Sequence, residues 1–506
     1  MARDNAERPC HPYWYRMWIL QEIAKGSVVH MVVGGWWLSW KYFSVMMELV
    51  EREPGANIKC QEAFYQNLPL GVFTLGSSQI ASIYNLRSRV HDDPCQEYSL
   101  TDCLALSSNS QATNPKDKIY ALSNLLGPSV NTPKVDYSDA YSTSSLYTDT
   151  AAALIGEDPF MTLFLAGRNI TLQDGAQNGE VANGLPLPSW VPDFSRCTAA
   201  DYELLELSRT HYHASRNHPG GLSSPPITVI GSTFLHMLVT PLSTIDRISP
   251  EAVDLGNQML LARLQTIPAV YHAAAQILPQ NTGLYPHCAP PQTTPDTASQ
   301  DLWRLLLPGS PPAVPQTWNE ALWRTLLADM APDRNQYNSQ SAIPTPGTYN
   351  VTTSPIACPA PPEFDTYLQV ALEQFSDLTT TDGIVTSKPL SPRLQQLLRA
   401  LPPAKRHLTY IGLHLTAAIK TANWKRRFAV SDKMQTMLVP EWAKEGDIVG
   451  VVRQISMPVV LRRDSRNNSD GLESWRLVGC CYVHGIMDGV YVEGKVPTEE
   501  RTFIVV

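Results

Sequence analysis

Apolar and polar side chains near the start of the chain follow the spacing of a helix. Trp14 and Trp18 stand four positions apart, so they would stack along one face of that helix. Pro12 suits a helix entry, and Gly26 is a typical residue at a helix end. The segment is apolar on most of its surface, which predicts a buried helix.

Three polar residues interrupt this apolar segment: Arg16, Gln21 and Glu22. A buried polar group without a partner costs about 1–3 kcal/mol, so we expect each of them to form structural hydrogen bonds in a core. Tyr15, Trp18 and Glu22 would share one angular position on the helix. That arrangement would hold the carboxylate against a phenol and an indole.

The following residues predict a strand and several helices. The strand is expected at residues 28–33, and helical spacing recurs at residues 40–51, 64–66, 80–89 and 99–107. A last helix is marked by Asn114 as its N-cap and by Pro115 in its first turn, and residues 127–128 end it. Asp117 occupies the third position, where its charge favours the positive helix end, so we prefer capping to catalysis for this residue.

The middle of the chain mixes helices with extended segments. Helices are expected at residues 141–155, 252–264, 268–278, 364–375 and 390–401, and strands at 227–231 and 235–245. Three prolines surround Trp190, which predicts an extended loop held by a buried indole. Asp193 could cap a following turn or pair with a buried arginine. Residues 279–362 are rich in Pro, Thr, Ser and Asn and predict a largely disordered insertion around a helix at 318–330.

Short β-branched segments dominate the C-terminal part. They lie at residues 428–430, 447–452, 459–462, 477–483 and 491–492, separated by turn residues. This pattern predicts a small antiparallel sheet or barrel, completed by the strands near 227–245. The chain is therefore expected to be an α+β protein, with a helix-rich first part, a helical middle and a β-rich C-terminal module.

Composition limits the possible partners and compartment. The net charge of −8 and a pI near 5.9 argue against nucleic-acid binding. The 9 cysteines are odd in number and scattered, so they are interpreted as reduced thiols. The N-terminus lacks the pattern of a signal peptide, and the most apolar stretch, residues 28–50, is broken by charged residues and glycines. These features predict a cytoplasmic protein that does not bind membranes.

Known catalytic and metal-binding patterns do not occur in the sequence. His211, His213 and Cys197 lack the paired spacing of a zinc site, as do Cys480 and Cys481. The chain also has no Gly-x-Ser-x-Gly elbow, no P-loop and no dinucleotide-binding glycine motif. No metal and no cofactor are therefore expected. His484 and Asp488 lie around two glycines, which indicates a turn between strands rather than a catalytic pair.

A series of short motifs resembles fungal heterokaryon-incompatibility (HET) domain proteins, in the same order along the chain. They comprise Trp14, Arg16, Trp18, Gln21 and Glu22; residues 28–35 with Trp40; residues 114–122 with Asp117; residues 135–138 with Asp136; residues 187–194 with Trp190 and Asp193; Gly446 and Asp447; residues 458–462; and residues 482–489 with His484 and Gly485. The resemblance implies a role in non-self recognition or cell-death signalling. It also implies that the chain binds other proteins, and it implies no particular oligomeric state.

The same resemblance gives Glu22 a possible catalytic role. Trp18 and Glu22 are similar to the glutamate-bearing helix of Toll/interleukin-receptor (TIR) domains, some of which cleave NAD with a glutamate. The chain lacks the earlier HET motifs, a strand and a helix that would bound the nucleotide pocket. We therefore expect a partial HET domain acting through protein contacts. A TIR-like NAD hydrolase using Glu22, and a degenerate fragment without activity, are the alternatives.

This interpretation divides the chain into four segments. Residues 1–128 would be the partial HET domain, and residues 129–278 a helical and extended region with the first strands of the C-terminal module. Residues 279–362 would be the insertion, and residues 363–506 would contain helices followed by the β-rich module.

Overall fold

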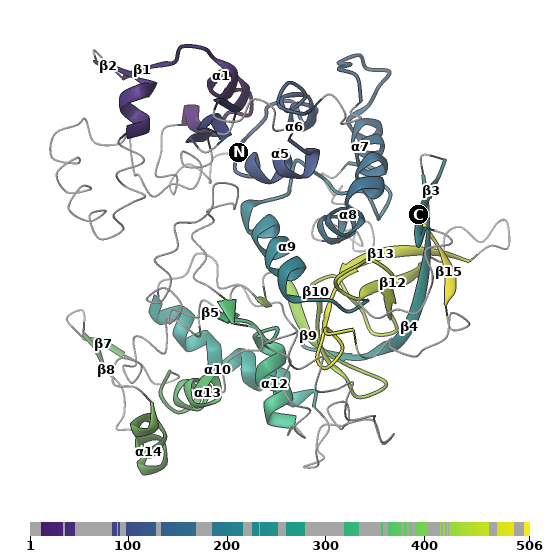
Figure 1. Cartoon of the computed structure of the whole chain (residues 1–506). Helices are drawn as coiled ribbons and strands as arrows, with labels where there is room; N and C mark the ends of the chain where they lie inside the picture. The colour runs from purple at the N-terminus through teal and green to yellow at the C-terminus, as the bar shows by residue number, and fades with distance from the viewer. Residues whose placement is uncertain are drawn as a thin grey trace, which may run out of the picture. The chain divides into compact units, whose positions relative to one another are not determined.

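Two compact units make up the computed structural model of the chain (Figure 1). Unit 1 comprises Met1–Leu165 and Thr171–Glu203, and unit 2 comprises Ala166–Ile170 and Leu204–Val506. The structure describes residues 12–33, 36–45, 83–84, 86–88, 90–91, 98–127, 133–167, 185–215, 225–231, 233–250, 260–278, 318–332, 356–357, 363–375, 379–381, 384–386, 391–401, 415, 418–419, 422–423, 425–464, 473–489 and 500–506. The four-segment division made from the sequence stays a prediction.

Unit 1 is mainly helical. Its elements are the 3-10 helix η2 (Pro12–Tyr15), α1 (Ile19–Lys25), the hairpin of β1 (His30–Val33) and β2 (Trp36–Ser39), α5 (Leu100–Leu106), α6 (Asp117–Tyr120), α7 (Thr143–Glu157) and most of α8 (Pro159–Ala166). Helix α9 (Ala199–His211) begins in unit 1 and continues into unit 2. Residues 40–45 are also helical.

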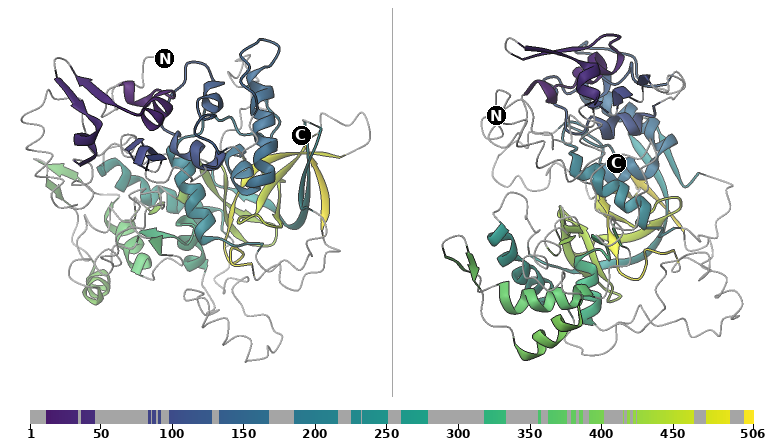
Figure 2. Two further views of the ribbon diagram at one scale, coloured as in Figure 1. Left: turned by 45° about the horizontal axis from the view of Figure 1, so that its top comes forward. Right: turned by 60° about the vertical axis from the view of Figure 1, so that its left-hand side comes forward.

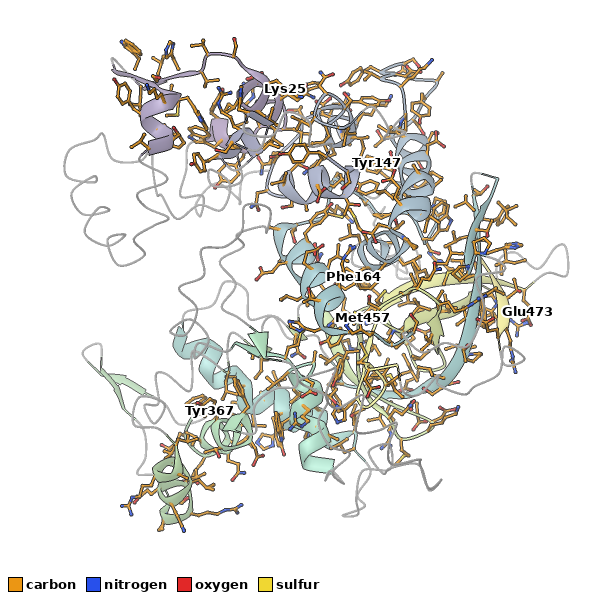
Figure 3. The ribbon with its side chains drawn as sticks, viewed as in Figure 1. Lys25, Tyr147, Phe164, Tyr367, Met457 and Glu473 are labelled. Carbon is orange, nitrogen blue, oxygen red and sulfur yellow. The ribbon has the colours of Figure 1, made fainter. Side chains whose placement is uncertain are left out.

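Polar caps explain where two of these helices begin. Ser99 and Asp102 form a reciprocal capping box at the start of α5, at the place the sequence predicts. The Ser142 hydroxyl accepts a hydrogen bond from the Ser145 amide at the start of α7. On α7, Tyr147, Ala151 and Leu154 are fully buried; Figure 3 labels Tyr147.

Unit 2 is built around a mixed, nine-stranded sheet. Its strands are β3 (Ile227–Ile230), β4 (Phe234–Ile248), β9 (Arg426–Ser431), β10 (Thr436–Pro440), β11 (Ile448–Val452), β12 (Val459–Asp464), β13 (Ser474–Cys480), β14 (Tyr482–Val483) and β15 (Arg501–Val505). The order is β11-β12-β13-β15-β4-β9-β10-β14, and β3 pairs with β4. Because β11 also pairs with β4, five strands form a closed ring.

The long strand β4 connects the two halves of the sheet (Figure 2). It pairs with β15 and β11 on one part of its length and with β9 near its end. The prediction that the strands near 227–245 join the C-terminal strands is therefore confirmed. Leu242, Ile245, Val449, Val460 and Val478 belong to the apolar core of this sheet.

A group of helices forms a second core within unit 2. It comprises α10 (Leu260–Gln276), α12 (Trp318–Leu326), α13 (Glu363–Gln374) and α14 (Pro392–Ala400). Trp323, Phe364, Tyr367 and Leu394 are among its buried side chains. Two short strand pairs accompany these helices: β5 (Ala331–Pro332) with β6 (Ile356–Ala357), and β7 (Thr379–Thr381) with β8 (Ile384–Thr386).

Several predicted elements differ from the observed ones. The single helix predicted from Trp14 is wrong, because η2 ends at Tyr15 and α1 begins only at Ile19. Residues 260–264 and 268–276 are helical as predicted, but the break predicted between two helices is wrong, because α10 is continuous and contains Pro268. Residues 252–259 lie outside the described residues. The helix predicted at 318–330 is confirmed by α12. The predicted disorder of residues 279–317, 333–355 and 358–362, the helix at 64–66 and the strand at 491–492 lie outside the described residues. Within the predicted insertion, residues 331–332 and 356–357 form paired strands instead.

The α+β class is confirmed by these helices and the mixed sheet. Among the described residues, no helix combines the length and apolar character needed to cross a lipid bilayer.

Candidate functional site

Glu22 lies on the polar side of α1. This helix buries Ile19, Leu20, Ile23 and Ala24, while Glu22 itself is exposed. The apolar positions follow helical spacing, so one face packs into unit 1 and the other carries the polar groups. A carboxylate in this position is solvated rather than enclosed.

The predicted stacking of Trp14 and Trp18 along one helix face is wrong. Trp14 is only 5% exposed, whereas Trp18 is 37% exposed and forms the N-cap of α1. Because a 3-10 turn precedes α1, the two indoles do not stack on one helical face. Arg16 is exposed as well, so the prediction of buried hydrogen bonds for Arg16 and Glu22 is wrong.

Gln21 fulfils the structural prediction that was made for it. Its side-chain amide donates to the carbonyl of Ala121, and its Oε1 accepts from Nδ2 of Asn124 at 2.9 Å. These bonds connect α1 to the turns that follow α6. Gln21 therefore positions α1 within unit 1.

A shallow depression lies beside Glu22. It has a volume of about 440 Å³ and is lined by Gln21, Glu22, Lys25, Gly26 and Asn124. Burial raises the pKa of the Tyr13 phenol, the negative charge of Glu22 raises it further, and Arg16 lowers it. The Glu22 carboxylate at this depression is exposed to water.

Arg87 holds the C-terminal end of α1, a role the sequence does not indicate. Its Nη1 donates to the carbonyl of Ile23 and to the carbonyl of Gly26 at 2.7 Å. The guanidinium also lies 5.5 Å from the centre of the Trp40 ring. A cation at a helix C-terminus satisfies free carbonyls and interacts favourably with the helix dipole.

The motif residues at 114–122 and 135–138 contact each other. Nζ of Lys116 donates to the carbonyls of Asp136 and Ser138 at 3.2 and 3.0 Å. The Tyr120 hydroxyl donates to the same Asp136 carbonyl at 3.0 Å. The Asp136 carboxylate accepts from the Ser138 amide, and hydrogen bonds from Ser138 lower the pKa of Asp136. These contacts fix a loop against α6.

Asp117 lies in the first turn of α6, where its charge favours the positive helix end as predicted, and it also contacts the loop at 135–138. Helix α6 has Lys116 at its N-cap, with no side-chain capping bond, and Asn114 accepts the Lys116 amide in a turn. The predicted Asn114 cap is therefore wrong. Oδ1 of Asp117 accepts from the Tyr137 hydroxyl at 2.6 Å. Burial raises the pKa of Tyr137, and this hydrogen bond raises it further.

The third motif of unit 1 packs against α7. Trp190 is fully buried, which confirms the predicted anchored indole. Asp193 caps the following turn through the Ser195 amide at 3.1 Å, and its neighbour Phe194 packs edge-on against Tyr147 at 5.2 Å. The Tyr147 hydroxyl donates to Pro115, so this motif and the one at 114–122 share one core.

In unit 2, one ion pair joins the motif of Gly446 and Asp447 to the motif at residues 458–462. Asp447 accepts from Nε and Nη2 of Arg462 at 2.8 Å each, and Nη2 also donates to the carbonyl of Trp442 at 2.7 Å. The Asp447 side chain is 3% exposed. Gly446 precedes it with a φ of +91°, which favours glycine. The two motifs thus fix β11 beside β12.

The last motif forms a turn after β14, as predicted. His484 is buried, and its Nδ1 lies 2.9 Å from the Tyr482 hydroxyl. Gly485 has a φ of +80°, so its conformation suits a turn.

Cys103, Cys197, Cys480 and Cys481 are buried free thiols, in agreement with the predicted reduced state. Within the described ranges, no group of three or more His, Cys, Asp or Glu side chains is placed to hold a metal ion.

No family model, curated protein or solved structure matches the chain. The motif residues of each unit make contacts within that unit. Those in unit 1 hold α6, α7 and the loops beside them, and those in unit 2 hold the strands of the sheet. Their contacts are those of structural residues.

Proposed function

We propose that the chain is a HET-type protein of fungal non-self recognition or cell-death signalling that acts by binding other proteins. The observation that carries this proposal is a group of exposed apolar side chains close to Glu22 in the sequence. Val28, Val32, Trp37, Tyr42 and Val45 are each more than half exposed. We call these five residues the N-terminal apolar surface.

The positions of these residues support a protein contact. Val32 and Trp37 are directly paired across the hairpin and are 70% and 68% exposed. Large apolar side chains that gather in one region and remain in water often mark a binding surface. Trp and Tyr are also frequent among the residues that contribute most to interfaces.

The enzymatic alternative has weaker support. A catalytic carboxylate commonly lies in an enclosed pocket, where burial and neighbouring charges adjust its proton affinity. Glu22 is exposed beside a shallow depression. We therefore expect no release of nicotinamide when the purified chain is incubated with NAD. Release above background that disappears in Glu22→Gln would instead establish the hydrolase.

The proposal is tested by inducible expression of the full chain in a filamentous fungus, with growth and dye exclusion as the readouts. Wild-type chain should arrest growth and kill cells, and Val32→Ser combined with Trp37→Ser should abolish that effect. The matched control is Ile230→Ser combined with Phe234→Ser, two exposed apolar residues of unit 2. Equal killing by both double variants, or no killing by any chain, would contradict the proposal.

A further inference from the structure

The backbone of β1 has one side available for hydrogen bonding. In the register of the hairpin, His30 pairs with Ser39, Met31 with Leu38 and Val32 with Trp37. The Trp40 amide donates to the Val29 carbonyl at 3.0 Å, which identifies 29 and 40 as a hydrogen-bonded pair. Hydrogen-bonded and non-hydrogen-bonded pairs alternate in an antiparallel ladder. His30 and Val32 therefore direct their N–H and C=O groups away from β2.

No described strand other than β2 pairs with β1. An unpaired strand edge can accept a further strand from another chain. An isolated two-stranded hairpin is also marginally stable, so a third strand would stabilise it. The edge thus offers hydrogen bonds that an extended peptide can complete.

The outward side chains of the hairpin are apolar and solvent-exposed. Val28, His30 and Val32 alternate along the exposed face, and Trp37 lies across from Val32. The His30 ring packs edge-on against Trp37 with a centroid distance of 5.1 Å. Met31 and Leu38, which point to the opposite face, are half-buried. An added strand would therefore find apolar neighbours on the outer face.

Charge indicates the composition of the partner. Between residues 12 and 45, Arg16, Lys25 and Lys41 are exposed cations, and Glu22 is the exposed anion. The whole chain, in contrast, carries a net charge of −8. A basic region on an acidic protein attracts an acidic partner and repels other acidic surfaces of the same chain.

We propose that β1 binds an extended, acidic segment of another protein as an additional strand; this inference rests on the proposed function and names its partner class. The partner would alternate acidic and β-branched residues. Its backbone would pair with His30 and Val32, and its apolar side chains would pack beside Trp37. A lipid surface fits less well, because a strand edge inserted into hydrocarbon would leave its backbone groups without partners.

The binding test uses the purified full chain and a fluorescein-labelled peptide, acetyl-Asp-Val-Glu-Val-Asp-Val-Glu-amide, with fluorescence anisotropy as the readout. The peptide should bind, and its dissociation constant should rise with added salt. A peptide of the same sequence with alternate backbone nitrogens methylated should bind at least tenfold more weakly. Equal binding of the methylated and parent peptides, or no binding of the parent peptide, would overturn the inference.

Variants of β1 test the same contact from the side of the chain. Val32→Pro removes one outward N–H, at a position where an edge strand tolerates proline, and should weaken binding at least tenfold. Val32→Thr keeps this N–H and should change binding less than threefold. Lys41→Glu should weaken binding, whereas Lys134→Glu, at another exposed lysine of unit 1, should not. Circular dichroism establishes that each variant is folded.

Two outcomes would assign the edge to another occupant and overturn the inference. One is binding of the chain to vesicles containing phosphatidylserine that is lost in Val32→Pro while the peptide is not bound. The other is a dimer in sedimentation that Val32→Pro dissociates. The two experiments distinguish failure of the proposed function from failure of this inference. If only the proposed function fails, killing is absent while the peptide still binds β1. Failure of this inference alone would leave killing intact in Val32→Pro.

Discussion

Replacing Asp447 by alanine should destabilise unit 2 by about 3 kcal/mol. The change removes a carboxylate that is 3% exposed and that accepts two bonds from Arg462 and one from the Lys444 amide. Breaking a buried ion pair from one side typically costs about 3–5 kcal/mol. Arg462 is 20% exposed and keeps its bond to Trp442, so we expect the lower end of that range.

The neighbouring arginine provides a matched control. Arg463 and Glu473 form an ion pair of 2.7 Å, but both side chains are about 60% exposed. An exposed pair contributes about 1 kcal/mol or less, so Glu473→Ala should have a small effect. Urea denaturation followed by tryptophan fluorescence gives the free energy of unfolding for each variant. Equal losses in Asp447→Ala and Glu473→Ala would refute the reasoning that burial determines the cost.

Three further predictions concern packing, backbone strain and pH. A Cβ on Gly167 would meet Cα of Gly479 at 2.1 Å, so Gly167→Ala should lower the free energy of unfolding by about 3 kcal/mol. Gly156 has open space around it, so Gly156→Ala should not lower this free energy. Ala328 has a φ of +49°, a conformation that costs about 1 kcal/mol for a residue with a Cβ, so Ala328→Gly should raise the melting temperature. A lower melting temperature of this variant would contradict the prediction. Burial, more than the charge of Asp102, raises the pKa of Cys103 from 9.0 to about 12. The unfolded thiol ionises first, so stability falls as the pH rises from 9 towards 12, by about 1.4 kcal/mol at pH 10. Cys103→Ala should reduce this fall in urea titrations at pH 7 and pH 10, and an unchanged fall would exclude the thiol as its cause.

Local signals in the sequence were sufficient for much of the fold. Ser99 and Ser142 mark helix starts because their hydroxyls accept backbone amides close by in sequence. The β-branched segments around β4 and β11 likewise predict strands, and in the first part of β4 buried residues alternate with less buried ones. Such signals require no knowledge of distant residues.

Other elements depend on contacts with distant segments, which local sequence patterns do not indicate. Strand β10 ends with Pro440, which is a poor strand signal, yet all of its residues are buried between β9 and β14. Tertiary packing outweighs local preference at this strand. Strand β15, in contrast, was not predicted although Thr502, Phe503 and Ile504 favour a strand, which pairs with β4 and β13.

The candidate site was predicted less well than the fold. The spacing of Trp14, Trp18 and Glu22 assumes a single helix, and the 3-10 turn at η2 invalidates that assumption. The partners Arg87 and Tyr137 come from distant segments, so no local pattern identifies them. The pairing of Asp447 with Arg462 could have been suggested, because the two lie at the ends of adjacent predicted strands.

The position of β4 in the sheet also determines the order in which unit 2 can fold during synthesis. Ile245 pairs with Ser431, Thr244 with Ile448 and Leu235 with Val505, so the partners of β4 emerge from the ribosome long after β4 itself. Such long loops close slowly, because distant pairings lose chain entropy before they gain contacts. Until β9, β11 and β15 have been made, the backbone of β4 lacks its pairing with these three strands. Nascent unit 2 should therefore depend on chaperones more than unit 1, whose helices form from nearby residues.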